Sequence, residues 1–389
     1  MEQQIEAVRD LFHRRFVGEP RVFRAPGRVN LIGEHTDYNG GFVLPVAIHL
    51  QTVVACASRS DRRFAVYAAD KGEAFEFDLD DVAAEGSSGS WQRYVEGTIR
   101  TIDAKQRLHH GADVIFSSTV PIGAGMSSSA ALEVGIGFSV SAINDIRINL
   151  LDLAQAGQSA EHNFVGTRSG IMDQYASAFG RQGHAILLDC RDLSTSFIQL
   201  DLPESSFVVC DSGVQHELAS SEYNRRREEC EQAVEVLNRS DPQIHQLRDV
   251  TFDDLNRCGG QLSDVQLKRA RHVVCENHRT VEAARYLSAR NLQRFGEMMF
   301  ESHASLREDF EVSCAELDLL VDTASRVEGV LGSRMMGGGF GGSTISLVSD
   351  RAKDRFYEEL SRDYLRQFGR VPAFYDVRSA DGVSEVILS

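Results

Sequence analysis

The sequence lacks the marks of several common classes of protein. Seven cysteines are spread singly along the 389 residues, with no CxxC pair and no zinc-ligand spacing: Cys56, Cys190, Cys210, Cys230, Cys258, Cys275 and Cys314. We therefore expect reduced, mostly buried thiols and neither a disulfide framework nor a zinc site. The N-terminal stretch has no apolar core of a signal peptide, and the longest apolar run, Phe42–Ile48, contains Pro45 and is too short to span a bilayer. These absences favour a cytoplasmic protein that binds no membrane.

Positive charge is also scarce. The chain has 41 Lys and Arg residues against 57 Asp and Glu residues, a formal net charge of −16. Nucleic acids and anionic membranes call for a basic surface, so neither is expected as the main partner. The charge does not exclude a small anion held by backbone N–H groups. With 42% hydrophobic residues, the chain can bury the cores of two ordinary domains.

Several catalytic motifs are absent as well. No Gly-Lys dipeptide occurs, which excludes a Walker A loop. The HRD and DFG motifs of protein kinases and the GxSxG motif of hydrolases are missing too. His216-Glu217 does not begin an HExxH metal motif, because Ser220 stands where the second His would be.

The order of the expected elements indicates the fold class. Short alternating or β-branched runs predict strands in the first half at Thr52–Ala57, Phe64–Ala69, Ala74–Leu79, Val114–Thr119, Ala185–Asp189, Phe197–Leu202 and Phe207–Asp211. Helical periodicity predicts helices at Ser129–Asn144, Leu150–Glu161, Ser221–Asn238, Asp264–Ser288 and Leu292–Phe310. Further short strands are expected at Thr344–Leu347, Ala373–Val377 and Glu385–Leu388. This segregation predicts an α+β chain with a boundary near residue 200, hence an N-terminal domain at 1–200 and a C-terminal domain at 201–389.

Three segments differ from ordinary loops, and the first is Arg24–Gly41. Arg28, Glu34, His35 and Asp37 fall within ten residues there, bracketed by glycines. Glycines permit the backbone angles of a binding loop, and mixed donors and acceptors could meet the hydroxyls of a polyol. A solvated polar turn is the alternative interpretation.

The second segment is Pro121–Glu133, PIGAGMSSSAALE, between an expected strand and an expected helix. The N–H groups at a helix start favour an anion, and Gly123 and Gly125 let a phosphate approach the backbone. Its serines could cap the helix, contact phosphate or bind a metal. A serine-capped helix after a glycine turn is the alternative. A dinucleotide fingerprint is excluded, since its third glycine position is Ser128.

The third segment is Met335–Thr344, MMGGGFGGST. It contains GxGxxG, but an expected strand follows rather than a helix, so it fails the test for a Rossmann motif. So many glycines imply backbone packed tightly against a neighbour. That neighbour is another strand, a bound ligand or the phosphate loop.

Together, in this order, the three segments resemble the three motifs of the GHMP family of small-molecule kinases. The first is similar to the galactokinase signature, RVNLIGEHTDYNGG at residues 28–41. The resemblance implies a two-domain GHMP kinase fold, with a mixed-sheet N-terminal domain, a helix-rich C-terminal domain and the active site in the cleft between them. It also implies an ATP-dependent sugar 1-kinase that makes galactose 1-phosphate and ADP, the first step of galactose catabolism, with Mg²⁺ as cofactor.

The resemblance assigns roles to matching residues. Asp173 is the implied catalytic base, with Arg28 beside it. The implied galactose contacts are Glu34, His35, Asp37, Gly170, Asp173 and Tyr223. The implied ATP contacts are Gly123, Ala124, Gly125, Met126, Ser127, Ser128 and Ser129, with Trp91 and Tyr94 as an aromatic pair near adenine. Ser129 and Glu161 match the magnesium ligands, a donor set that suits a hard cation. Ordinary core packing is the alternative for the aromatic pair.

Two positions depart from the family pattern. Met336 stands where many relatives have Thr, and Ser343 stands where Cys is common. The serine run at 127–129 and the two alanines after it are intact, which favours a kinase over a galactose sensor of the same family. A sister kinase acting on N-acetylgalactosamine, arabinose or galacturonate is the other alternative. We expect a monomer whose partners are galactose and ATP.

Overall fold

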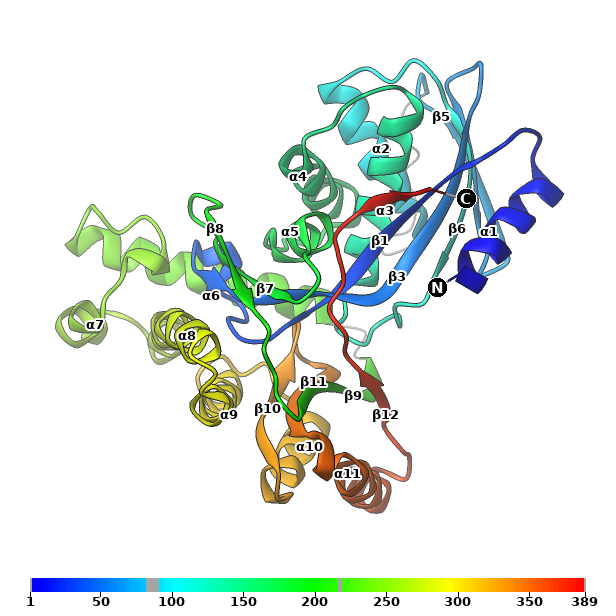
Figure 1. Ribbon diagram of the computed structural model, residues 1–389. Coiled ribbons are helices and arrows are strands. Elements are labelled where there is room, and N and C mark those ends of the chain that lie inside the picture. Colours follow the sequence, from blue (N-terminus) through cyan, green and yellow to red (C-terminus); the bar gives the residue numbers. More distant parts are fainter. Residues whose placement is uncertain (1, 82–90, 216–218, 388–389) are drawn as a thin grey trace.

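The computed structural model describes residues 2–81, 91–215 and 219–387. An upper region built on a large sheet, a lower region built on a smaller sheet and a group of helices at one side make up the molecule (Figure 1). None of the described helices combines the length and the apolar character that crossing a membrane requires.

The upper region contains a mixed sheet, which has six strands among the described residues. Its order is β13 (Ser384–Val386), β1 (Arg21–Asn30), β3 (Pro45–Ser58), β6 (Ala112–Ser118), β4 (Arg63–Ala68) and β5 (Glu73–Asp78). Only the β4–β6 pair of this described sheet is parallel. Helix α1 (Glu2–Arg15) covers one face (Figure 1). The other face carries α2 (Trp91–Lys105), α3 (Ser128–Ile143), α4 (Leu150–Ala160) and α5 (Met172–Phe179).

Both faces of this sheet are buried because successive side chains of a strand point to opposite sides. Val53 of β3 packs with Phe12 of α1, whereas its neighbour Val54 packs in the core beneath the other helices. On β6, Ile115 packs on the α1 side and its neighbour Val114 packs on the side of the other helices. The central strand β3 is therefore buried over most of its length, whereas the outer strands β4 and β5 alternate or are largely exposed.

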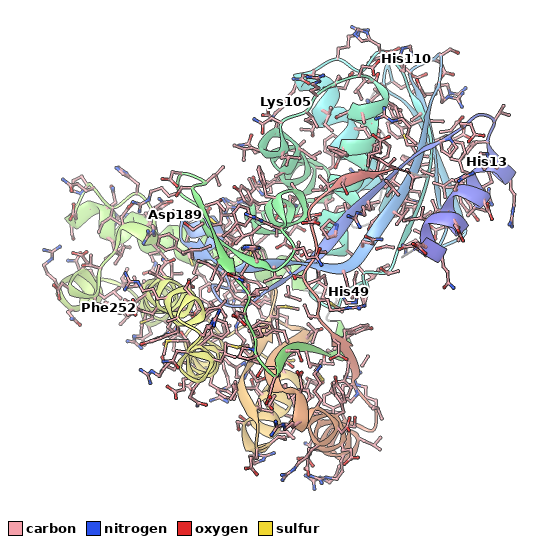
Figure 2. All side chains as sticks on the ribbon, in the orientation of Figure 1. His13, His49, Lys105, His110, Asp189 and Phe252 are labelled. Carbon is pink, nitrogen blue, oxygen red and sulfur yellow. The ribbon has the colours of Figure 1, made fainter. Side chains whose placement is uncertain are left out.

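The lower region contains an antiparallel sheet, with the order β10 (Val330–Met336), β11 (Gly341–Ser349), β9 (Ser205–Gln215) and β12 (Ala373–Asp376). It packs against α10 (Ala315–Arg326) and α11 (Lys353–Phe368). The side group consists of α6 (Ala219–Ser240), α7 (Phe252–Cys258), α8 (Asp264–Ser288) and α9 (Leu292–Glu308). A small sheet of β2 (Phe42–Val43), β7 (His184–Asp189) and β8 (Thr195–Gln199) lies beside these helices. Asp189, labelled in Figure 2, pairs there with Arg248 at 3.3 Å.

The chain crosses between the regions more than once. Strand β9 opens the lower sheet, but β13 returns to the upper sheet and pairs with β1, Val386 opposite Val22. On its way it passes His49 of β3, whose backbone N–H donates to the Arg378 carbonyl at 2.9 Å (Figure 2). The expected boundary near residue 200 stays a prediction.

The α+β class is confirmed, as are the expected long helices, which appear as α3, α4, α6, α8 and α9. The expected last strand is shorter, and Leu388 lies outside the described residues. The segment from Arg24 begins as strand β1 rather than as a loop, because its apolar side chains are buried on both faces of the sheet. Helices α1, α2, α5, α7, α10 and α11 were not among the expected elements. Cys56, Cys210 and Cys230 are free and buried, as expected.

Candidate active site

Residues from all three segments line one cavity of about 250 Å³. Its lining is Arg28, Glu34, His35, Asp37, Tyr94, Ser129, Glu161, Thr167, Ser169, Gly170, Met172, Asp173, Tyr223, Gly337 and Gly338. A larger hollow of about 590 Å³ lies between α1 and the outer strands β4 and β5, but it does not gather carboxylates beside a glycine loop. The smaller cavity is therefore the candidate active site.

At the centre of the cavity, Arg28 and Asp173 form a two-pronged ion pair. Arg28 Nε lies 2.7 Å from Asp173 Oδ1, and Nη2 lies 2.9 Å from Oδ2. Strand β1 carries Arg28, and the first turn of α5 carries Asp173. The Ser127 hydroxyl also donates to Asp173 Oδ2. The Asp173 side chain keeps 29% exposure, so this carboxylate faces the cavity while its partner is buried.

Burial lowers the pKa of Arg28, but the charges of Asp173 and Glu34 outweigh it, so the pKa stays above its usual value. The guanidinium is charged at any physiological pH. It gives the cavity a fixed cation close to Asp173, the carboxylate that the family resemblance implies as the base.

Asp37 is a second carboxylate in this cavity. Its Oδ1 accepts the Tyr38 backbone N–H at 3.0 Å. Burial, followed by the nearby charge of Asp173, raises the pKa of Asp37 to about 7. Gly170 lies against it: a Cβ on Gly170 would come within 1.8 Å of Asp37 Oδ2. A glycine is therefore needed here for Asp37 to keep its position.

Glu34 lies at the wall of the cavity and already has several protein partners. Its Oε2 accepts from Asn30 at 2.8 Å, and its Oε1 accepts the Gly337 backbone N–H at 2.8 Å. Buried Arg334 pairs with the same Oε1 at 3.1 Å. Glu34 thus joins the first segment to the third, and its role as a sugar contact stays a prediction.

His35 adopts a left-handed backbone conformation, with φ of 62°. Burial, with a smaller effect of His272, lowers its pKa to about 3, so the ring is neutral. Nε2 lies 3.2 Å from the Gly338 carbonyl, which can only accept, and Nδ1 lies 2.8 Å from the Tyr38 hydroxyl. The Nε2–H tautomer satisfies both contacts. The Tyr223 ring lies against this ring at a tilt of 39°, with centroids 5.3 Å apart, and completes that wall.

Ser129 and Glu161 meet at the start of α3 and the end of α4, where the Ser129 hydroxyl donates to Glu161 Oε1 at 3.1 Å. Ser169 donates to the other oxygen. Burial raises the pKa of Glu161 to about 7. Among the described residues the causes that shift the pKa of Glu161 include no cationic side chain, so a bound cation would supply the positive charge that this site lacks. The pair fits Mg²⁺, which would complete its shell with phosphate oxygens and water.

The second segment forms a tight turn before α3. Gly123 and Gly125 have φ values of 78° and 67°. Ser127, before the helix, makes no capping hydrogen bond, because its hydroxyl faces Asp173 instead. The first-turn N–H groups therefore lack a side-chain cap, which fits a phosphate site.

The third segment is the β10–β11 hairpin, and it packs on the phosphate loop. A Cβ on Gly125 would lie 3.1 Å from the Met336 carbonyl. The Ser343 hydroxyl donates to the Ala124 carbonyl at 2.7 Å. The sequence left open whether the third segment packs against a strand, a ligand or the phosphate loop. It packs against both a strand and the phosphate loop.

The aromatic pair is separated by the fold. Tyr94 lines the cavity. Trp91 is 8% exposed, contacts Phe75 and Phe116 edge-on, and donates to Glu73 at 2.6 Å, the environment of a core residue. An adenine contact for Trp91 stays a prediction.

Three residues of this site were not predicted from the sequence: Ser169 and Thr167 line the cavity, and Arg334 pairs with Glu34. Arg334 carried a signal, because it is a charged residue in an apolar strand directly before the glycine-rich segment. Ser169 precedes Gly170 and has no pattern of its own.

Comparison with known proteins agrees with this geometry. Residues 10–58 match the galactokinase galactose-binding signature, residues 93–181 the N-terminal domain of GHMP kinases, and residues 283–366 their C-terminal domain. Galactokinase of Roseiflexus sp. (strain RS-1) is 44% identical, covering 98% of this chain and 97% of that protein. Galactokinase of Chloroflexus aggregans is 46% identical, with 96% of each chain covered.

Solved structures agree as well. Lactococcus lactis galactokinase complexed with galactose has a TM-score of 0.93 at 34% identity, over 98% of this chain and 99% of that one. Methanococcus jannaschii mevalonate kinase, 18% identical, has a TM-score of 0.65 over 94% of this chain and 99% of its own, which shows the fold alone. The fold and the site define a GHMP small-molecule kinase. Within that class, the chain belongs to the galactokinase family.

Proposed function

We propose that the protein transfers the γ-phosphate of ATP to the C1 hydroxyl of α-D-galactose, giving galactose 1-phosphate and ADP. The ion pair of Arg28 and Asp173, next to a phosphate loop in a cavity of sugar size, carries this proposal. Phosphoryl transfer asks a protein mostly for positioning and charge neutralisation, and this cavity offers both.

Asp173 accepts the proton of the C1 hydroxyl. The sugar oxygen then bonds to the γ-phosphorus as the bond from that phosphorus to the β–γ bridging oxygen breaks, and ADP leaves with the electron pair. The Arg28 guanidinium stabilises the negative charge that develops on the transferred phosphoryl group. Bound at Ser129 and Glu161 with ATP, Mg²⁺ would neutralise phosphate charge.

Specificity follows from carboxylates fixed in the sugar site. Asp37 has an oxygen available to accept from a sugar hydroxyl, whereas the Glu34 oxygens already accept from Asn30 and Gly337. An axial 4-hydroxyl can meet a fixed acceptor that an equatorial one misses. A buried carboxylate left without that partner costs about 1–3 kcal/mol, so glucose should be a poor substrate.

The test is ADP release by purified protein with MgATP, comparing galactose, glucose, N-acetylgalactosamine and no sugar. Release with galactose alone supports the proposal. Release only with another sugar contradicts the substrate and supports a sister kinase. Protein that binds ATP but releases no ADP with any sugar would be a sensor.

We also expect a cytoplasmic monomer that binds neither nucleic acid nor membranes. The net charge of −16 supports the absence of polyanionic partners. Light scattering on the eluting protein measures its mass, and a dimer mass would contradict the expected monomer.

A further inference from the structure

Three successive carbonyls of the phosphate loop are held by groups from other parts of the chain. The Ala124 carbonyl accepts from the Ser343 hydroxyl at 2.7 Å. The Gly125 carbonyl accepts from the Arg28 guanidinium. The Met126 carbonyl accepts from the Arg28 backbone N–H at 3.1 Å. Donors on β11 and β1 thus fix the direction of three consecutive peptide planes.

The direction of these planes determines where the next three N–H groups point. In a trans peptide the C=O and the following N–H point in opposite directions, and the described chain has no cis peptide. The N–H groups of Gly125, Met126 and Ser127 therefore point away from Ser343 and Arg28. None of the three donates a hydrogen bond within the described part of the chain. Consecutive free N–H groups of this kind form an anion-binding nest.

Ser343 is the donor whose role the proposed mechanism leaves unexplained. It is fully buried on β11, opposite Asp211 and Met336 in the sheet. A hydroxyl is a better hydrogen-bond donor than a thiol, so Ser343→Cys is a graded test of this contact. Arg28 also contacts Asp173, so a change there would disturb the chemistry, whereas the Ser343 hydroxyl contacts the Ala124 carbonyl.

We propose that Ser343 is a positioning residue for the nucleotide: its hydroxyl, through the Ala124 carbonyl, keeps the phosphate loop in the shape that binds the diphosphate of ADP and the triphosphate of ATP. This proposal rests on the ATP site of the proposed function. It does not depend on which sugar accepts the phosphate.

The strand itself offers a matched control. Ser346, on β11 as well, is also fully buried, and its hydroxyl lies 2.8 Å from that of Ser333. Removing either hydroxyl deletes one buried hydrogen bond from the same strand. Only the Ser343 hydroxyl contacts the phosphate loop.

The experiment is calorimetric titration of Ser343→Ala, Ser343→Cys and Ser346→Ala with MgADP, and separately with galactose. For Ser343→Ala we expect the Kd of MgADP and the KM of ATP to rise on the order of 3- to 10-fold, the loss of one neutral hydrogen bond. The Kd of galactose should stay within about 2-fold, and Ser343→Cys should recover part of the affinity. Ser346→Ala should lower the melting temperature and leave MgADP binding unchanged.

Two results would overturn the proposal: an unchanged MgADP affinity in Ser343→Ala, or an equal loss in Ser346→Ala. If Ser343→Ala does not fold, an MgADP affinity of Ser343→Cys equal to that of the parent protein would also overturn it. The titration contains no sugar, so weak MgADP binding by Ser343→Ala would stand even if the parent protein failed to phosphorylate galactose.

Discussion

Asp173 is held by three donors, two on Arg28 and one on Ser127. The proton that Asp173 would accept belongs to an anomeric hydroxyl, which is more acidic than an ordinary alcohol. The same contacts fix the carboxylate oxygens in place, which is the larger contribution in a reaction governed by positioning.

Replacing Asp173 with Asn should lower kcat by about 10²- to 10⁴-fold, because the amide cannot accept the proton. The Kd of MgADP should change by less than about 3-fold, since the phosphate loop keeps both bonds from Arg28. Single-turnover kinetics with galactose measures the first effect, and calorimetry the second. Asp189→Asn, at an ion pair with Arg248, is the control. A variant that kept most of its kcat would show that Asp173 is not the base.

Asp37 should make galactose binding depend on pH. Its pKa is raised to about 7 by burial and then by Asp173, so the free protein holds it largely protonated below pH 7 and ionised above. A carboxylate accepts stronger hydrogen bonds from hydroxyls than the neutral acid does. Galactose affinity should therefore increase as pH rises from 6 to 7 and level off above 8. Titrations across this range should show a flat profile for Asp37→Asn, and an equally steep one would exclude Asp37 as the cause.

At the scale of helices and strands, the elements predicted from the sequence are those that hydrophobic periodicity and the placement of glycines indicate. Helix α3 after the phosphate loop was expected because a strand, a glycine turn and small apolar residues follow one another. Strand β1 was not expected, because the glycines of the first segment were interpreted as those of a binding loop. In the structure, Gly27 lies where the register of β1 against β3 shifts. A side chain there would meet the Met126 carbonyl at 2.7 Å.

The site was predictable only where a motif marks it. The burial of Trp91, on helix α2, depends on Phe75 of β5 and Phe116 of β6, so no local pattern indicates it. The ion pair and hydrogen bond that occupy the Glu34 carboxylate likewise come from Arg334 and Gly337, some 300 positions away. Contacts of this kind follow from the packing of whole elements.

The close packing of the turn before α5 against the first segment gives a prediction for Gly170. Gly170→Ala places a Cβ against Asp37 and should displace that carboxylate. The KM of galactose should rise roughly 10- to 100-fold, with the Kd of MgADP unchanged. Steady-state kinetics checks this. Gly260→Ala, where an added Cβ meets nothing within 4 Å, is the control, and an unaltered KM in Gly170→Ala would contradict the contact.

At the scale of the whole molecule, two buried histidines join the first segment to the helical group. Burial is the main cause that lowers the pKa of His35 to about 3 and that of His272 to about 4. His272 Nε2 lies 3.1 Å from the Glu34 carbonyl, and Nδ1 lies 2.9 Å from the Ser305 hydroxyl. Both rings are neutral when folded, whereas an unfolded chain protonates them near pH 6.5.

At these two histidines the unfolded state thus binds more protons below pH 6.5, so their contribution to the free energy of unfolding should fall as pH drops from 6.5 toward 4. Asp37 and Glu161, whose pKa is raised to about 7, contribute with the opposite sign in the same range, so the histidine contribution is measured as a difference between variants. Each histidine contributes up to about 1.4 kcal/mol per pH unit in that window. Urea titrations at pH 7.5, 6.0 and 5.0 measure the slope. The increase in the free energy of unfolding per pH unit should be smaller in His272→Gln than in the parent protein, by up to about 1.4 kcal/mol. The exposed His110→Gln (Figure 2) should keep the parent slope. Equal slopes in all three proteins would contradict this account.

Strand β13 closes the upper sheet from the far end of the chain, and Arg21 and Glu385 join the two strands by paired hydrogen bonds of 2.7 and 2.8 Å across 364 positions. A ribosome makes β1 long before it makes β13. During synthesis the nascent upper sheet therefore has β1 as an open edge, a template for wrong pairing, until residues 384–386 emerge. Helix α1 and helix α3 after the phosphate loop can assemble early, but the sheet that carries Arg28 is complete only after the lower region has been translated.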